Sequence, residues 1–129
     1  MSFFLHTTLK AKTPVSKKTG VLWSTIAKSI LGARYDLSVV LVGNARSHRL
    51  NLTYRGKDKP TNVLAFPVTE TDGEIYLNIP YAIKEAPRYD HAPAHHLTYL
   101  FIHGLLHLKG LNHGPKMEAL EAKLLKRFA

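Results

Sequence analysis

Three of the eight histidines fall within one short run, residues 103–113, which reads HGLLHLKGLNH. His103 and His107 are four residues apart, so on a helix their side chains project from the same face one turn apart. Gly110 can adopt the left-handed conformation that reverses the chain after a helix, which would carry His113 back toward the other two. Three imidazoles around one ion leave a fourth position for water, as in catalytic zinc sites. The run therefore predicts a metal site formed by His103, His107 and His113.

Two observations bear on this prediction. The sequence contains no cysteine, which excludes a disulfide framework, thiol catalysis and Cys-ligated zinc or iron–sulfur centres. Any metal must then be held by His, Asp or Glu. The alternative is that these histidines are satisfied core residues whose spacing arose by chance. Because both spacings and the intervening glycine occur together, we favour metal binding.

The same spacing is that of the metzincin proteases, in which a glutamate follows the first histidine and acts as the general base. Gly104 occupies that position here, and glycine cannot accept a proton. The proteolytic mechanism therefore lacks its base, which disfavours a metallohydrolase acting on a peptide or small ester.

A strong excess of positive charge points to a polyanionic partner. Lys and Arg number 18 against 9 Asp and Glu, which leaves a formal net charge of +9. Nucleic acid is the commonest such partner, and an anionic membrane surface is the other candidate. No apolar run approaches the roughly 18 residues of a membrane span, and nothing resembles a targeting segment. We expect a soluble, cytoplasmic protein with no membrane role.

The chemistry of these residues has a parallel in one family. Residues 103–113 resemble the HGxxHLxGxDH motif of the YbeY family of bacterial endoribonucleases, also called rRNA maturation factors. Residues 54–67, YRGKDKPTNVLAFP, are similar to that family's YRGxDKPTDVLSFP, and Gly73-Glu74-Ile75 resembles its short Gly-Asp-Ile hairpin. The order and separation of these blocks fit a full-length member.

The resemblance implies a zinc-dependent, single-strand-specific endoribonuclease that acts in maturation of the 16S rRNA 3′ end and in ribosome quality control. Its partners would be ribosomal RNA and the small ribosomal subunit, in a bacterial cytoplasm. It places the zinc ligands at His103, His107 and His113 and a functionally important arginine at Arg55. Other proteins of the ribosome are expected partners, without an identity.

The charged loop of residues 55–60 supplies candidates for RNA binding. Arg55 can offer paired donors to phosphate oxygens, a geometry that lysine lacks. We expect Arg55 to lie beside the histidine helix and to hold the scissile phosphate, while Lys57 and Lys59 contact the RNA backbone as point charges. Tyr54 and Tyr76 are weaker candidates for base stacking, and ordinary packing is the better interpretation of both.

Three positions depart from the family pattern. Asn62 and Asn112 stand where the family has Asp, and Ala65 stands where it has Ser. Two carboxylates that could orient a ligand or take a proton are therefore missing. These changes favour a second hypothesis, a non-catalytic ribosome-assembly or RNA-binding factor that keeps zinc for structure. Glu74 is a possible remaining acid or base, although a surface carboxylate is the better interpretation.

Hydrophobic patterning predicts the elements that position these groups. Strands are expected from the N-terminus to Leu9, over 37–42, over 63–66 and over 74–78, with a hairpin turn at 71–73. Helices are expected over 21–31, from Asn44 to about Tyr54, from about His95 to Lys109, and from Pro115 onward. His95 and His96 are expected to be exposed polar residues, whereas Phe101 and the leucines around it are expected to be core.

This order of elements predicts an α+β fold in which helices pack on a small mixed sheet. The chain has 129 residues and shows no repeat and no long linker, so we expect a single domain over 1–129.

Overall fold

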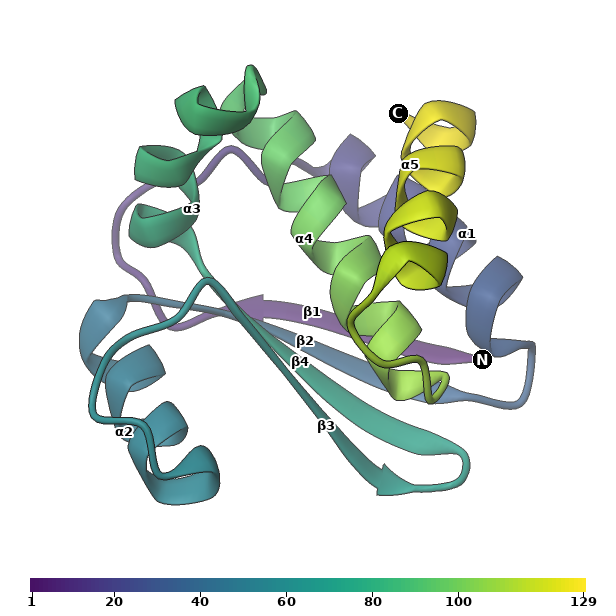
Figure 1. Cartoon of the computed structure of the whole chain (residues 1–129), viewed down its shortest axis with the longest axis horizontal. Helices are drawn as coiled ribbons and strands as arrows, with labels where there is room; N and C mark the ends of the chain where they lie inside the picture. The colour runs from purple at the N-terminus through teal and green to yellow at the C-terminus, as the bar shows by residue number, and fades with distance from the viewer.

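The computed structural model describes residues 1–129, and its four strands form one mixed sheet in the order β1-β2-β4-β3 (Figure 1). The strands are β1 (Ser2–Thr7), β2 (Asp36–Val42), β3 (Val63–Thr69) and β4 (Asp72–Asn78). β2 runs parallel to both β1 and β4, whereas β3 is antiparallel to β4 and is joined to it by a tight turn. β1 and β3 are therefore the two edges of the sheet.

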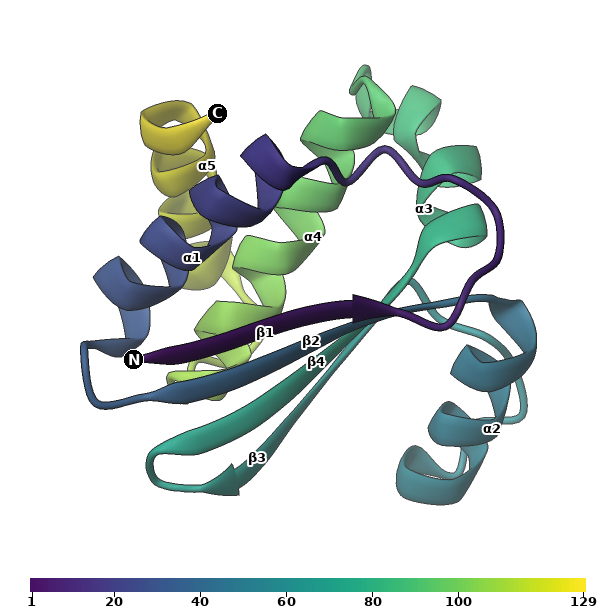
Figure 2. The same cartoon turned by 180° about the vertical axis from the view of Figure 1, so that it is seen from behind.

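Most helices cover one face of this sheet. They are α1 (Lys17–Leu31), α2 (Asn44–Arg55), α3 (Ile79–Glu85), α4 (Pro93–Leu108) and α5 (Pro115–Phe128), with a 3₁₀ turn, η1 (Ala86–Tyr89), after α3. Figures 1 and 2 show α1, α3, α4 and α5 above one face, while α2 lies below one end of the sheet. The predicted α+β fold with a small mixed sheet is confirmed.

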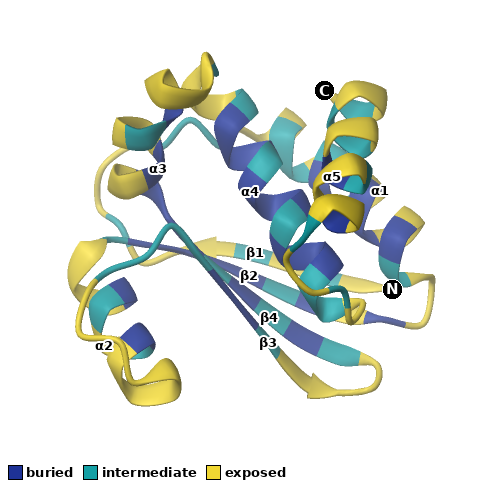
Figure 3. Ribbon diagram, viewed as in Figure 1, coloured by how far each residue is buried: buried dark blue, intermediate teal, exposed yellow.

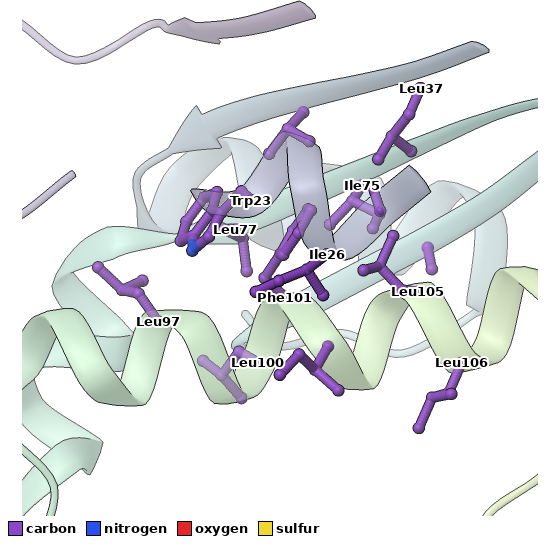
Figure 4. Packing of buried hydrophobic residues seen from close by; sticks show 14 of the residues in the cluster. Trp23, Ile26, Leu37, Ile75, Leu77, Leu97, Leu100, Phe101, Leu105 and Leu106 are labelled. Atoms are coloured by element: carbon purple, nitrogen blue, oxygen red, sulfur yellow. The ribbon is translucent and has the colours of Figure 1, made fainter. Parts of the chain in front are cut away.

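Helix α4 is the centre of the core, and its buried residues occupy several sides of the helix (Figure 3). Trp23 of α1 stacks on Phe101 of α4 with ring centroids 4.6 Å apart, and its indole Nε1 donates a 2.9 Å hydrogen bond to Thr98. Figure 4 shows Leu105 and Leu106 pointing to different sides of the same helix. Since neighbours surround α4, the side chains that it presents to a cavity are held in fixed directions.

Gly104 lets α4 approach the sheet closely. A Cβ atom at this position would lie 3.1 Å from Cδ1 of Ile75 on β4, tighter than an ordinary contact. Gly104, which stands where metzincins have their glutamate base, is thus also a point at which α4 lies close to Ile75 of the sheet.

The structure differs from the predicted elements in several places: β1 ends at Thr7 and not at Leu9, and the hairpin turn lies at 70–71 and not at 71–73. Helix α1 begins four residues earlier than expected, because the Ser16 hydroxyl accepts a hydrogen bond from the Thr19 amide and caps the helix. Strand β3 continues through Pro67 to Thr69. A proline, which has no backbone N–H, is tolerated there because β3 is an edge strand. Helix α3 and η1 were not predicted.

Because α3 and η1 were not predicted, the expectation for His96 was also wrong. His96 is fully buried, not an exposed polar residue, because α3 and η1 cover this end of α4. His95 is half-buried. None of the helices is both long enough and apolar enough to cross a lipid bilayer.

Candidate metal centre

The three histidines singled out by their spacing lie together. His103 and His107 project from the last two turns of α4, and their Nε2 atoms are 3.0 Å apart. The His113 ring lies 4.9 Å from that of His103 and 4.7 Å from that of His107, measured between centroids. One ligand atom from each residue lies within 4.8 Å of the others. We call His103, His107 and His113 the histidine triad.

A reversal after α4 brings His113 to the other two. The Gly110 amide donates to the His107 carbonyl, and the Leu111 amide donates to the Leu106 carbonyl, which closes the end of the helix. Gly110 has a φ of 102°, in the left-handed region predicted for it. The chain then runs back and begins α5 at Pro115.

The outward-facing nitrogens of two imidazoles are already engaged. His103 Nδ1 lies 2.9 Å from a carboxylate oxygen of Glu121, and His107 Nδ1 lies 3.1 Å from the Leu111 carbonyl. Both partners are acceptors, so each Nδ1 carries the proton and each Nε2 keeps its lone pair. In a tetrahedral zinc site with bonds of about 2.0–2.1 Å, two nitrogens stand about 3.3 Å apart. Ring orientation and donor spacing of His103 and His107 therefore fit a divalent transition-metal ion, and His113 offers a third ligand atom within 4.8 Å of theirs.

The electrostatics of the triad also suit a metal ligand. Burial lowers the pKa of His107, and electrostatic interaction with His103, His113 and Arg55 lowers it further, against the opposing effect of its hydrogen bond to the Leu111 carbonyl. His107 is thus neutral at neutral pH, which is the form that binds a metal.

Glu121 is a site residue that sequence analysis did not identify. It lies on α5, is 4% exposed, and contacts both His103 and the Tyr99 hydroxyl. Burial and the Glu121 carboxylate together raise the pKa of Tyr99, which keeps the phenol protonated. A signal was present, because Glu121 follows Met117 by four residues and so falls on the apolar face of α5.

The triad opens into a cavity of about 420 Å³. Arg55, Lys57 and Lys59 line this cavity together with the triad, so the structure brings the predicted cationic residues to the predicted metal site. The Arg55 guanidinium lies 5.9 Å from the centre of the Phe66 ring and donates a 3.5 Å hydrogen bond to the Ala65 carbonyl.

Helix α2 fixes the loop that carries these cations. The Ser47 hydroxyl accepts a 3.0 Å hydrogen bond from the Thr61 amide and donates a 2.8 Å bond to the Thr61 carbonyl. The Asn51 side chain donates a 2.8 Å bond to the Lys59 carbonyl. Both Ser47 and Asn51 are buried, so the loop is anchored at two points near its C-terminal end.

The weaker candidates from the sequence lie outside this cavity. Glu74, Tyr54 and Tyr76 do not line it. Tyr54 and Tyr76 pack against Phe66 instead, with ring centroids 5.2 and 5.8 Å away. The carboxylates in the lining are Glu121 and Glu118, and only Glu118 has no hydrogen-bond partner.

The two asparagines that depart from the family motif occupy different surroundings. Asn62 lines the cavity, and its amide donates 3.0 and 3.4 Å hydrogen bonds to the Glu85 carboxylate. An aspartate at position 62 would instead place a second negative charge against Glu85. Asn112 is exposed and does not line the cavity.

Known proteins resemble this chain over most of its length. The family model described as "Endoribonuclease YbeY" matches residues 7–129. A protein of that name from Chromohalobacter salexigens is 41% identical over 108 residues, which span 74% of this chain and 70% of the relative. One from Chelativorans is 40% identical over 71% of this chain and 62% of the relative. One from Ehrlichia ruminantium is 35% identical over 95% of this chain and 84% of the relative.

The fold has a counterpart among solved structures. The solution structure of a Thermotoga maritima protein superposes with a TM-score of 0.70 at 25% sequence identity, covering 98% of this chain and 88% of that one. The family match extends over nearly the whole chain and includes the triad and the cationic loop. The chain therefore belongs to the YbeY family of endoribonucleases, which are RNA-cleaving hydrolases.

Proposed function

We propose that the chain is a zinc-dependent endoribonuclease that cuts single-stranded RNA, and that its substrate is ribosomal RNA at the 16S 3′ end. The observation that carries this proposal is the shared cavity, in which three convergent imidazoles lie with Arg55, Lys57 and Lys59. A metal-ligand set and a set of phosphate-binding cations are the two requirements of metal-assisted phosphodiester hydrolysis. The ribosomal substrate rests on the family, and the net charge of +9 suits any RNA.

His103, His107 and His113 are the proposed ligands, presented as neutral imidazoles. When bound, a zinc ion in such a site acts as a Lewis acid toward phosphate and activates water near neutral pH. Glu121 holds His103 by its Nδ1 proton, and the Leu111 carbonyl holds His107 in the same way. These contacts set the ring directions before any ion arrives.

Arg55 is proposed to bind the scissile phosphate. Its planar guanidinium can donate two parallel hydrogen bonds to phosphate oxygens and stabilise charge that develops there during attack. The side chain rests on Phe66 and the Ala65 carbonyl, which limits its freedom while leaving it exposed to the cavity. Lys57 and Lys59 are proposed to contact flanking phosphates.

Glu118 is the proposed proton-transfer group. It is the carboxylate in the cavity lining that has no hydrogen-bond partner, whereas Glu121 is committed to His103 and Tyr99. Since Asn62 and Asn112 cannot accept a proton from water, Glu118 takes the role for which Glu74, on the sheet and outside the cavity, is not placed.

Cleavage assays with matched RNAs test the proposal. The purified, zinc-loaded chain should cut a single-stranded RNA of the 16S 3′ end, spare the same sequence in a duplex, and lose activity with a chelator. Arg55→Ala should lower the cutting rate at least ~100-fold, as loss of one transition-state donor does elsewhere, with zinc content unchanged. Tight, salt-sensitive RNA binding without cutting would contradict the enzyme and select a non-catalytic assembly factor.

A further inference from the structure

The cavity extends from the triad to a group of aromatic side chains that the proposed chemistry does not use. Tyr99 lies one helical turn before His103 on α4, and Tyr89 at the end of η1 lines the same cavity. The Tyr89 and Tyr99 ring centroids are 5.7 Å apart. Figure 1 shows the segment of α3 and η1 beside the N-terminal half of α4. A volume of about 420 Å³ exceeds the needs of one phosphate and falls in the range of small-molecule pockets.

Tyr89 is the exposed member of an aromatic cluster, which we define as Tyr89, His91, His96 and Tyr99. The Tyr89 ring lies 4.8 Å from His96 and 5.8 Å from His91. His96 is fully buried and bonded at both nitrogens, 2.7 Å to Glu85 and 3.0 Å to His91 Nδ1. Tyr89 itself remains 47% exposed. A tyrosine ring that packs against other aromatic rings on one side and is exposed on the other can stack with a nucleobase.

Backbone hydrogen bonds fix the turn that follows Tyr89. The His91 amide donates a 3.1 Å hydrogen bond to the Ala86 carbonyl, and the Asp90 amide donates a 3.2 Å bond to the Pro87 carbonyl. Asp90 has a φ of 55° and is the one non-glycine residue of the chain with a positive φ. Such a conformation persists where its surroundings impose it, and it often accompanies a functional position.

Charge around the cavity separates into two regions. Arg55, Lys57 and Lys59 are the cations of the lining, and none of them belongs to the aromatic cluster. The two carboxylates that contact the cluster are both engaged elsewhere: Glu85 accepts hydrogen bonds from His96 and Asn62, and Glu121, which contacts Tyr99, also lies 2.9 Å from His103 Nδ1. Burial and neighbouring His95 and His96 lower the pKa of His91, which keeps its ring neutral. One part of the cavity thus suits phosphates, and the other suits an uncharged aromatic group.

We propose that Tyr89 binds a nucleobase of the RNA strand, that of a nucleotide next to the scissile phosphate, by stacking. This inference rests on the proposed function and extends it, because only an unpaired base can turn out of its strand onto a tyrosine ring. A preference for single-stranded RNA then has a physical origin in the cavity. Stacking is tolerant of base identity, so the site selects strandedness more than sequence.

Removing bases one at a time from the RNA tests the site without changing the protein. The probe is a short single-stranded oligoribonucleotide with cleavage-resistant phosphorothioate linkages, in versions that each lack one base. Binding to the zinc-loaded chain is measured by fluorescence anisotropy. One abasic position should weaken binding by ~5- to 150-fold, the equivalent of 1–3 kcal/mol for a stacked base. Equal binding by every abasic version would overturn the proposal.

A protein variant then links that base to Tyr89. Tyr89→Ala should weaken binding of the intact probe by a similar factor and become insensitive to the abasic position, whereas Tyr89→Phe should behave as wild type. Tyr81→Ala is the matched control, since Tyr81 is also exposed but lies outside the cavity. Thermal unfolding checks that each variant is folded. A Tyr89→Ala protein as sensitive to the missing base as wild type would refute the assignment.

The base site and the proposed function can fail separately. If the chain cuts no RNA but the abasic position and Tyr89→Ala still show coupled losses, the base site stands and the nuclease proposal falls. If the chain cuts single-stranded RNA and neither change affects binding, the nuclease proposal stands and the base site falls.

Discussion

Each imidazole of the triad needs one nitrogen directed at the ion and the other held away from it. In His103 and His107 the second nitrogen is bonded to Glu121 and to the Leu111 carbonyl, at 2.9 and 3.1 Å. Such partners fix the tautomer and the ring direction, and their loss commonly costs 10–100-fold in metal affinity. We therefore expect Glu121 to act as a positioning residue for the metal rather than as a ligand.

Glu121→Gln should lower zinc affinity about tenfold or more while leaving the three ligands in place. The glutamine keeps the size of the side chain but loses the charge that supports the imidazole proton. The measurement is a competition titration with a chromophoric chelator. Glu118→Gln is the matched control, because Glu118 lies one turn earlier on α5 without contacting the triad; its zinc affinity should be unchanged and its RNA cutting slowed. Unchanged zinc affinity in Glu121→Gln would show that the contact does not support the metal.

At the residue scale, the sequence predicted what depends on local spacing. The triad was predicted from intervals of four and ten residues together with Gly110, and all of these residues lie within the short segment 103–113. Glu121 is 18 residues from His103, and no local pattern connects them. His96 was placed wrongly because its burial depends on its partner Glu85, which lies on the unpredicted helix α3.

The element that converts a helical pair into a three-residue site is the reversal between α4 and α5. It depends on Gly110, whose φ of 102° is unfavourable for residues with a Cβ atom. No other heavy atom lies within 4 Å of a Cβ built there, so backbone conformation is the main constraint.

Gly110→Ala should therefore destabilise the fold by about 1–2 kcal/mol and also weaken zinc binding, because relaxation of the turn displaces His113. Thermal unfolding and zinc titration measure the two effects. Gly32→Ala provides a matched control, since Gly32 has a φ of 93°, is equally uncrowded, and ends α1 rather than α4. It should lower the melting temperature to a similar extent and leave zinc affinity intact. Equal loss of zinc affinity in both variants would contradict a local role for the reversal.

At the element scale, long apolar patterns were sufficient and short ones were not. Helix α4 was predicted because apolar residues occur almost all round it in one continuous pattern, and 9 of its 16 residues are buried in the structure. Helix α3 has seven residues and carries Pro80 in its first turn, and η1 follows it directly with Pro87. Such a segment has little periodicity, and its cap, in which the Asn78 side chain accepts from the Tyr81 amide, is a weak signal in isolation.

For the whole molecule, a charge of +9 matters through its placement. Arg55, Lys57 and Lys59 surround the triad's cavity, whereas Lys28 of α1 belongs to a helix that does not line it. Because phosphate binding releases counterions, each cation that contacts RNA adds to the salt dependence of binding.

The binding constant for single-stranded RNA should fall with salt with a log–log slope of about −2, from three contacts at about 0.7 each. Arg55→Ala should make the slope less steep by about 0.7, and Lys28→Ala should not change it. Filter binding across a series of salt concentrations gives these slopes. A slope that both substitutions change equally would indicate diffuse attraction and not a defined phosphate track.

Whole-molecule architecture was predictable in class and not in detail. The alternation of short apolar strands with amphipathic helices predicted an α+β fold with a mixed sheet. The strand order β1-β2-β4-β3 was not predictable, because pairing of β1 with β2 and of β2 with β4 depends on contacts across 30 or more residues. The strand order also decides whether the loop that carries Arg55, Lys57 and Lys59 lies next to the triad.

Zinc stoichiometry tests the central claim most directly. Equilibrium titration of the purified chain should show one tight zinc site per molecule, lost in His107→Ala and retained in His48→Ala, whose histidine lies on α2 away from the triad. Equal zinc binding by wild type and His107→Ala, or none by either, would contradict a metal centre built from His103, His107 and His113.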